Sequence, residues 1–317
     1  MKYVIALIST FLIVYFIIPF LMKLFVKYDF LDKPTKRKNH RDPIPLCGGV
    51  GMFIGFFIVY FLAMGRNINK ENISVFIGAL AILIIGLVDD YYKTRGKEFP
   101  IYPRFLVQIL AAILVYNSGI SFSGFTNPIT GEFIQLHIAL QFLLTVTWLF
   151  GVTTVINWSD GMDGLAGSIS TISSVTLFIV ALVMNQSDSA IVCIILVGAI
   201  LGFLNYNRHP AVVFMGDSGA NFLGFILGII ALDGAFKQAT IMSLFIPILA
   251  LGVPIFDNIF VIFKRYTEGK PVYQADRSQI HFRLQEKGLT TNQVVAYICA
   301  ISFVLSLLSI VLLFIKI

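Results

Sequence analysis

The sequence predicts an all-α polytopic membrane protein with about ten transmembrane helices. Its 317 residues are 57% hydrophobic and only 13% charged, with a mean hydropathy of +0.87, whereas soluble domains carry about a quarter charged residues. Apolar runs long enough to cross a bilayer recur along the whole chain. Because no soluble appendage or internal repeat interrupts them, we expect one integral membrane domain over residues 1–317.

Ten apolar segments define the predicted spans. In chain order they cover residues 3–25, 46–64, 73–88, 104–117, 137–156, 166–184, 190–204, 219–234, 240–262 and 292–315. The first is too long for the core of a signal peptide, and no small-residue cleavage site follows it, so we expect it to be retained. Cys47, Cys193 and Cys299 lie in or beside apolar segments without metal-ligand spacing, which predicts packing roles.

The charged residues predict the orientation of these spans. With the N-terminus outside, the outer side holds five of the 23 lysines and arginines, and the inner loops hold the other 18. Cytoplasmic loops are enriched in basic residues, so we expect both termini outside and the loops after odd-numbered spans in the cytoplasm. Only four of the 17 acidic residues fall outside: Glu71, Glu132, Asp188 and Asp233. Charges of both signs therefore gather on the cytoplasmic face, which predicts chemistry there.

Two loops carry signals of local structure. The outer loop 118–136 places Pro-Ile-Thr-Gly between β-prone residues and predicts a hairpin. The inner loop 263–291 contains "ADRSQIHFRLQEKG", which predicts a short helix with Asp276 as its N-cap and Gly288 as its stop. On that helix Arg277 and His281 share a polar stripe, which fits either a binding surface or a solvated face.

Five carboxylates lie at three predicted helix ends on the inner face. Asp89 and Asp90 end the third span, where adjacent carboxylates repel unless a cation neutralises them. Asp160 and Asp163 are three residues apart at the start of the sixth span, so on a helix they would share one face. Asp217 starts the eighth span. Each alone fits a solvated end or an N-cap, but together they indicate a hard cation such as Mg²⁺.

Basic side chains accompany these carboxylates. Lys36 belongs to a cluster before the second span, where a membrane anchor explains most of the charge. Lys93 and Arg104 bracket the second inner loop and are expected to reach phosphates. Carboxylates for a metal, cations for anions and glycine-rich helix starts are the components of a phosphoryl-transfer site. A phosphorylated substrate that resides in the membrane would be a lipid phosphate.

Asp257 in "LGVPIFDNIF" lies inside or near the inner end of the ninth predicted span. An acid at such a position indicates a functional role. A salt bridge to a basic residue one or two turns further along the helix explains it equally well. The histidines have no paired spacing, which argues against zinc.

Five motifs occur in order along nearly the whole chain: "KRKNHRDPIPLCGGVGMF", "GLVDDYYK", "NWSDGMDGLAG", "NRHPAVVFMGDSGANFLG" and "GVPIFDNIFVIFKR". This series resembles that of the polyprenyl-phosphate N-acetylhexosamine-1-phosphate transferases, which include the phospho-N-acetylmuramoyl-pentapeptide transferases. These integral membrane enzymes start the lipid intermediates of teichoic acid, enterobacterial common antigen, O-antigen and peptidoglycan. The ordered series is more specific than any single acidic pair.

The resemblance implies a multi-pass enzyme of the bacterial plasma (inner) membrane. It would transfer an N-acetylhexosamine-1-phosphate from UDP-GlcNAc or a related UDP-amino-sugar to undecaprenyl phosphate and release UMP. By the family pattern, Asp217 would be a direct ligand of Mg²⁺, with Mn²⁺ as an alternative. Asp89, Asp90, Asp160 and Asp163 would be catalytic, and the sequence leaves open whether any acts as a nucleophile. The expected substrate-binding residues are Asn157, Lys36, Lys93, Arg104, Asn207, His281 and Arg277.

The last inner loop departs from the family pattern. Relatives that act on UDP-GlcNAc typically read Asp-Arg/Lys-Ser-His-x-His-His-Arg-Leu, whereas this chain reads "DRSQIHFRL". Gln279 and Phe282 thus replace two histidines, and Arg104 stands where a lysine is common. Gln279 can form hydrogen bonds but cannot carry a proton near neutral pH. This departure is compatible with a donor other than UDP-GlcNAc and with a less active enzyme.

Three alternatives stay open at this point. The muramoyl-pentapeptide transferase branch is the nearest, although "VYQADRS" is closer to the hexosamine branch. A transporter could also use membrane carboxylates, but it is expected to show internal repeats and interrupted helices near mid-membrane. A degenerate lipid-binding member is the third. The expected partners are undecaprenyl phosphate, a UDP-amino-sugar and membrane lipid, with no nucleic acid, and a homodimer is left open.

Overall fold

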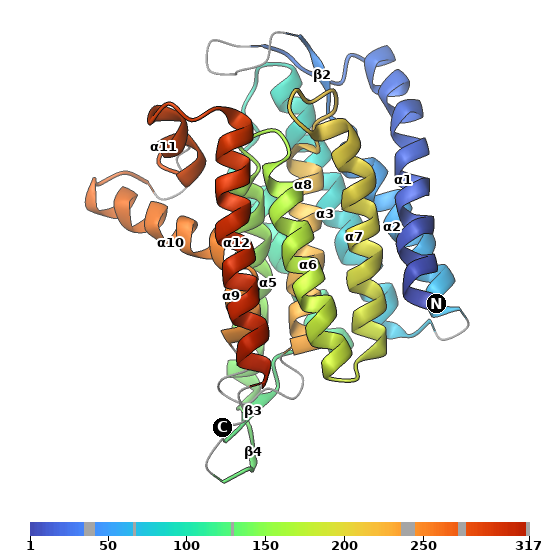
Figure 1. The fold of residues 1–317 in the computed structure, drawn as a ribbon, viewed down its shortest axis with the longest axis vertical. Helices are drawn as coiled ribbons and strands as arrows, with labels where there is room; N and C mark the ends of the chain where they lie inside the picture. Colours follow the sequence, from blue (N-terminus) through green and yellow to red (C-terminus); the bar gives the residue numbers. More distant parts are fainter. Residues whose placement is uncertain (35–41, 66–67, 128–129, 236–244, 272–276, 315–317) are drawn as a thin grey trace.

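The fold of this chain, seen in a computed structural model, is one bundle of long helices (Figure 1). The structure describes residues 1–34, 42–65, 68–127, 130–235, 245–271 and 277–314. In chain order the helices are α1 (Lys2–Lys27), α2 (Gly48–Met64), α3 (Lys70–Thr94), α4 (Ile101–Ser118), α5 (Ile138–Ser159), α6 (Leu165–Val183), α7 (Ser187–Asn207), α8 (Gly216–Ile230), α9 (Phe245–Ala250), α10 (Gly252–Thr267), α11 (Ile280–Glu286) and α12 (Thr291–Phe314).

Seven of the described helices are long and apolar enough to cross a membrane: α1, α3, α4, α5, α6, α7 and α12. The shorter α2 is also apolar. These lengths agree with the all-α membrane architecture that the composition predicts. The number of crossings and the sidedness of the loops remain predictions.

Two short antiparallel strand pairs and a five-residue π-helix, η1 (Ala231–Ala235), are the other elements within the described residues. Strand β1 (Leu31–Asp32) pairs with β2 (Ile44–Pro45), and β3 (Gly124–Thr126) pairs with β4 (Phe133–Gln135). The second pair confirms the hairpin predicted for residues 118–136. In Figure 1 this hairpin lies at the same end of the bundle as the N-terminus and the last turn of α12, whereas α11 and β2 lie at the opposite end.

Helix α8 is the buried axis of the bundle. Every residue from Ser218 to Ile230 is buried, and α8 packs against α3, α5 and α2. The close approach of α3 depends on Gly86, because a Cβ there would overlap the backbone of Ser218 in the first turn of α8. A helix that is apolar on all sides belongs in the interior of a bundle. Its N-terminus is therefore fixed against the end of α3.

The predicted span 240–262 is wrong as one continuous helix. The described part breaks at Leu251 into α9 and α10, and α10 turns away from the bundle (Figure 1). Pro254 accounts for the break, because it has no N–H to donate to the carbonyl of Ala250 four residues earlier. That carbonyl instead accepts a hydrogen bond from the Ser173 hydroxyl at 2.6 Å.

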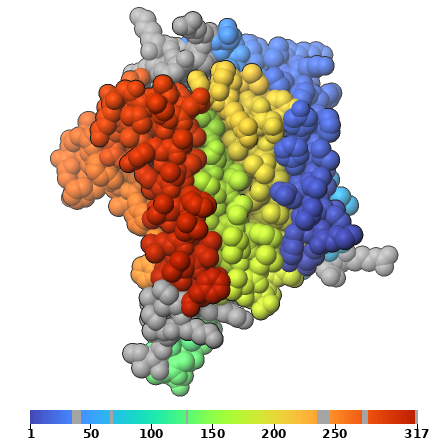
Figure 2. Space-filling view, in the orientation of Figure 1, coloured from blue at the N-terminus to red at the C-terminus, as the bar shows by residue number. Residues whose placement is uncertain are grey.

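The short helix predicted in the last inner loop is present as α11, but its predicted start is wrong. Gln279 occupies the N-cap position, and Asp276 lies outside the described residues. Helix α11 ends just before Gly288, whose φ of +91° is a backbone conformation that favours glycine. Figure 2 shows α1, α7, α6 and α12 side by side on one face, with the α10–α11 segment protruding beside α12.

Candidate active site

Asp90 joins the end of α3 to the start of α8. Its two carboxylate oxygens accept hydrogen bonds from the N–H groups of Asp217, at 2.8 Å, and Ser218, at 3.1 Å. These are donors that the first turn of a helix leaves without an intrahelical partner. Gly216 fits closely beside this contact, since a Cβ there would overlap the Asp90 carboxylate. Asp90 is therefore a buried cap for α8, a role that its sequence pattern did not predict.

Lys93 and Arg104 neutralise the two neighbouring carboxylates. The Lys93 ammonium lies 2.7 Å from Asp217 Oδ1 and 3.1 Å from Asp89 Oδ2. Arg104 Nη1 lies 2.7 Å from Asp89 Oδ2 and 3.3 Å from Asp217 Oδ2. The Asp89 side chain is 1% exposed, whereas that of Asp217 is 21% exposed. Asp217 is thus the carboxylate of this cluster that a ligand can reach.

The carboxylate cluster fits a metal only in part. No group of three or more His, Cys, Asp or Glu side chains with metal-binding geometry occurs within the described ranges. Mg²⁺ in phosphoryl-transfer sites typically takes one or two carboxylates, with substrate phosphates and waters completing its shell. The exposed Asp217 carboxylate, flanked by two cations that can also hold phosphates, suits this donor set.

Asp160 lies in the turn between α5 and α6, close enough to the first cluster for their charges to interact. Burial raises the pKa of Asp160 to about 8, and the negative charges of Asp217 and Asp90 contribute to the increase. Its backbone N–H donates to the carbonyl of Asn157 at 3.2 Å, at the end of α5. The Asn157 side chain is partly buried in the same last turn. Loop and cluster therefore share one electrostatic environment.

The expectation that Asp160 and Asp163 share a helical face is wrong. Helix α6 begins only at Leu165, because Gly164 adopts a left-handed conformation with φ of +73°. Both acids therefore lie in the turn before the helix. Asp163 points to the loop after α7, where its Oδ2 accepts the N–H of Ala211 at 3.2 Å and lies 2.7 Å from His209 Nδ1.

Asn207, the last residue of α7, holds this turn by a hydrogen bond. It is 4% exposed, its Oδ1 accepts the N–H of Gly164 at 3.0 Å, and its Nδ2 donates to the carbonyl of Val213 at 2.8 Å. Both ends of its amide are therefore occupied within the protein. In this structure Asn207 positions the Asp160–Gly164 turn.

Residues 277–283 of the loop before α12 cover the same turn. His281 is 1% exposed and packs against Gly161, and burial lowers its pKa to about 4. Gln279 Nε2 donates to the carbonyl of Trp158 at 3.1 Å. Arg277 is exposed, with its guanidinium 5.8 Å from the centre of the Phe282 ring. Of the predicted substrate-binding residues in this loop, only Arg277 has an exposed side chain.

Several contributors were missed by sequence reasoning. His209 lies 46 residues from Asp163 in the sequence, and only the fold brings the two together. The salt bridge predicted for Asp257 was to a residue of its own helix, but Asp257 pairs with Arg283 on α11 at 2.8 Å. Lys36 lies in 35–41, outside the described residues.

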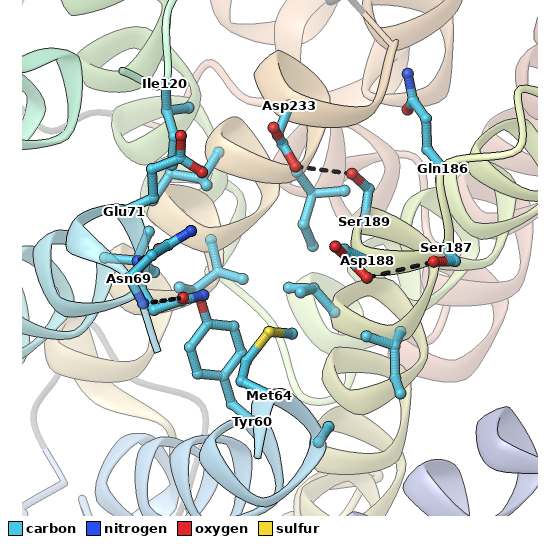
Figure 3. A pocket seen from close by; sticks show the side chains of 18 of the residues that line it. Tyr60, Met64, Asn69, Glu71, Ile120, Gln186, Ser187, Asp188, Ser189 and Asp233 are labelled. Carbon is cyan, nitrogen blue, oxygen red and sulfur yellow. Dashed lines mark hydrogen bonds between the residues drawn. The ribbon is translucent and has the colours of Figure 1, made fainter. Parts of the chain in front are cut away.

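A cavity of about 520 Å³ (Figure 3) is lined by the first residues of α3 and α7, away from this site. Glu71, Asp188 and Asp233, three of the four acids predicted to lie outside, line it. The Asp233 carboxylate accepts a hydrogen bond from Ser189 at 2.8 Å. None of the predicted site residues that the structure describes lines this cavity, so its size does not identify the active site.

Comparison with known proteins gives one family. The profile of glycosyl transferase family 4 matches residues 72–235, a segment that contains Asp89, Asp90, Asp160, Asp163 and Asp217. A Bacillus subtilis (strain 168) protein named "Probable undecaprenyl-phosphate N-acetylglucosaminyl 1-phosphate transferase" is 36% identical over 311 residues, which cover 98% of this chain and 85% of that protein.

Two further relatives are more distant. A decaprenyl-phosphate N-acetylglucosaminephosphotransferase of Mycobacterium tuberculosis (H37Rv) is 29% identical over 84% of this chain and 71% of its own length. A phospho-N-acetylmuramoyl-pentapeptide-transferase of Listeria welshimeri is 29% identical over 88% of this chain and 90% of its own length. The resemblance drawn from the motifs is confirmed, and the chain belongs to glycosyl transferase family 4.

Proposed function

We propose that this protein transfers an N-acetylhexosamine-1-phosphate from a UDP-amino-sugar to undecaprenyl phosphate, releases UMP and so starts a lipid-linked glycan of a bacterial cell envelope. The observation that carries the proposal is the cluster in which Lys93 and Arg104 join Asp89 to the exposed Asp217 at one end of an apolar bundle. The relative with 36% identity, whose name gives undecaprenyl phosphate and N-acetylglucosamine 1-phosphate, supports the same reading.

The proposed reaction joins two phosphates. An oxygen of the lipid phosphate attacks the β-phosphorus of the UDP-sugar and forms a new P–O bond. The bond from that phosphorus to the bridging oxygen breaks, and UMP leaves with that oxygen. Lys93 and Arg104 hold the phosphate of the lipid acceptor, because each cation can exchange a carboxylate contact for a phosphate contact. Asp217 would hold Mg²⁺, which would neutralise charge on the phosphates.

The placement of the acids favours an enzyme over a transporter. Asp89 and Asp90 lie in the last two turns of α3, and Asp217 lies in the first turn of α8. They thus gather at one end of the bundle, with the Asp160–Gly164 turn beside them. A transporter is expected to bind near mid-membrane between broken helices. The interrupted α9–α10 segment carries none of these acids.

The second candidate is a phospho-N-acetylmuramoyl-pentapeptide transferase. Relatives with this name match most of the chain, at 29% identity. We favour the hexosamine reaction because the match at 36% identity bears that type of name. Gln279, which donates to the Trp158 carbonyl, and Phe282, which lies under Arg277, are the positions where a different sugar preference would arise.

The test is UMP release by the purified protein in detergent. Undecaprenyl phosphate, Mg²⁺ and one UDP-sugar at a time are supplied, with UDP-N-acetylmuramoyl-pentapeptide included among the donors. Lipid-dependent release with one amino sugar supports the proposal and identifies the donor. Release with the pentapeptide donor alone selects the second candidate. Full activity in the presence of a divalent-metal chelator would remove the Mg²⁺ part of the proposal.

A further inference from the structure

Helix α11 is a short helix between α10 and the long helix α12. It contains seven residues, and a helix of this length is not stable in isolation. Figures 1 and 2 show that it lies beside the bundle, above α10 and next to the upper end of α12. Its position must therefore be fixed by particular side chains.

Asp257 of α10 supplies the main polar anchor of α11. Its Oδ1 and Oδ2 each lie 3.0 Å from the backbone nitrogen of Ile280, so the N–H of the first residue of α11 is shared between them. Arg283, one turn further along α11, donates to Oδ1 at 2.8 Å. The Asp257 side chain is only 9% exposed. One carboxylate thus holds both the start and the first turn of α11.

Asn258, the residue after Asp257, is hydrogen-bonded to α5. Asn258 Nδ2 donates to the carbonyl of Val155 at 3.2 Å, in the last turns of α5. Because consecutive helical residues point in directions about 100° apart, the pair can bind two neighbours at once. One turn of α10 therefore fixes α11 and the end of α5 relative to each other.

The residues on either side of Ile280 contact the candidate active site. Gln279 donates to the carbonyl of Trp158 at the end of α5, and His281 packs on Gly161 in the Asp160–Gly164 turn. The hydrogen bonds at Ile280 set the direction of the backbone between these two side chains. A shift of that backbone would move both contacts together.

We propose that Asp257 is a positioning residue for the donor nucleotide, which acts through α11 and the Asp160–Gly164 turn and does not touch the substrate. This inference rests on the proposed function, since the turn is taken as part of the site for the UDP-amino-sugar. The lipid acceptor is assigned to the Lys93–Arg104 cluster, which is in no direct contact with Asp257. Loss of the anchor should therefore affect the donor selectively.

The test compares Asp257→Ala and Asp257→Asn in the UMP-release reaction. Asp257→Ala should raise KM for the UDP-sugar about tenfold, because a charge-assisted anchor is lost. Asp257→Asn should have a smaller effect, since its amide oxygen can still accept the Ile280 N–H. KM for undecaprenyl phosphate and kcat should change less than about twofold in both. Glu268→Gln, at an exposed acid that pairs with Lys270 beyond the end of α10, is the matched control and should behave as the wild type.

Hydrogen exchange of the amides in 280–286 measures the anchor without activity. Exchange should be faster in Asp257→Ala than in Glu268→Gln, with an unchanged melting temperature. Faster exchange with an unchanged donor KM would overturn the proposal. So would an equal loss in the donor and acceptor parameters accompanied by a lower melting temperature, because that pattern describes a general structural role.

Failure of the proposed function would be visible separately, as a wild-type protein that releases no UMP with any donor. UDP binding by calorimetry then decides. UDP that binds more weakly to Asp257→Ala than to wild type supports the positioning role. Binding that is equal in both proteins, or absent from both, overturns it.

Discussion

Individual residues of the candidate site have two kinds of role: several are buried and hold the backbone in place, and one acid is accessible to a ligand. Asp90 uses both oxygens to cap α8, and Asn207 uses both ends of its amide on the turn before α6. Asp89 is buried between two cations, whereas Asp217 is partly exposed. The sequence predicted that these residues belong to the site. It could not divide their roles, because the division depends on which backbone groups face each side chain after folding.

Asp217→Asn should reduce UMP release at least about a hundredfold while leaving the fold intact. The amide keeps the size of the side chain but removes the charge that Lys93 and Arg104 balance and that a cation would need. The initial rate and the melting temperature would be measured together. Asp188→Asn, the same change at an exposed acid near the other end of the bundle, is the control and should retain wild-type activity. Near-normal turnover in Asp217→Asn would remove Asp217 from the reaction.

His281 should make stability depend on pH in a defined direction. Its pKa is about 4 in the folded protein against an ordinary value of 6.5, so the unfolded chain binds the proton more tightly. The associated stability is complete above pH 6.5 and decreases as the pH falls towards 4, by up to about 3 kcal/mol. Thermal unfolding at pH 7.5 and 4.5 should therefore show a smaller difference for His281→Asn than for wild type. An equal difference in the two proteins would contradict this.

Helices were largely predictable because apolar length is a strong signal in a membrane protein. The spans 3–25 and 292–315 agree closely with α1 and α12. The break at Leu251 was missed because the run 240–262 is mostly apolar, and its Gly-Val-Pro sequence was not treated as a stop. The turn before α6 was missed for a similar reason, since Gly164 can either continue a helix or end it, and its backbone conformation is set by Asn207.

Gly86→Ala tests how helix packing supports the site. Its Cβ would overlap the backbone of Ser218, so α3 and α8 must separate, at a cost of about 1–3 kcal/mol for overpacking. The separation would also weaken the Asp90 cap, and UMP release should fall about tenfold or more. Gly151→Ala on α5 is the matched control, because no atom lies within 4 Å of its added Cβ. It should be neutral or slightly stabilising, and equal effects of the two changes would argue against a specific α3–α8 contact.

At the scale of the whole molecule, the fold gathers charge at one end of an apolar bundle. Residues of α3, α4 and α8 form the cluster, with the turn before α6, α10 and α11 beside it. Motif order along the chain predicted which residues would meet, but their meeting depends on α8 being buried at the centre. The distribution of lysines and arginines predicts which end of the bundle faces the cytoplasm, because basic residues are enriched in cytoplasmic loops.

Cysteine labelling of intact cells would decide that orientation. Glu98→Cys lies in a loop predicted to be cytoplasmic, and Glu132→Cys lies in the hairpin predicted to be outside; both side chains are exposed. Cys47 and Cys193 are buried, and the half-buried Cys299 would be replaced by alanine to remove background. An impermeant maleimide should label Glu132→Cys in intact cells, and Glu98→Cys only after permeabilisation. The reverse pattern would place the acidic cluster outside the cell, where a cytosolic UDP-sugar could not reach Asp217, and would contradict both the orientation and the proposed donor.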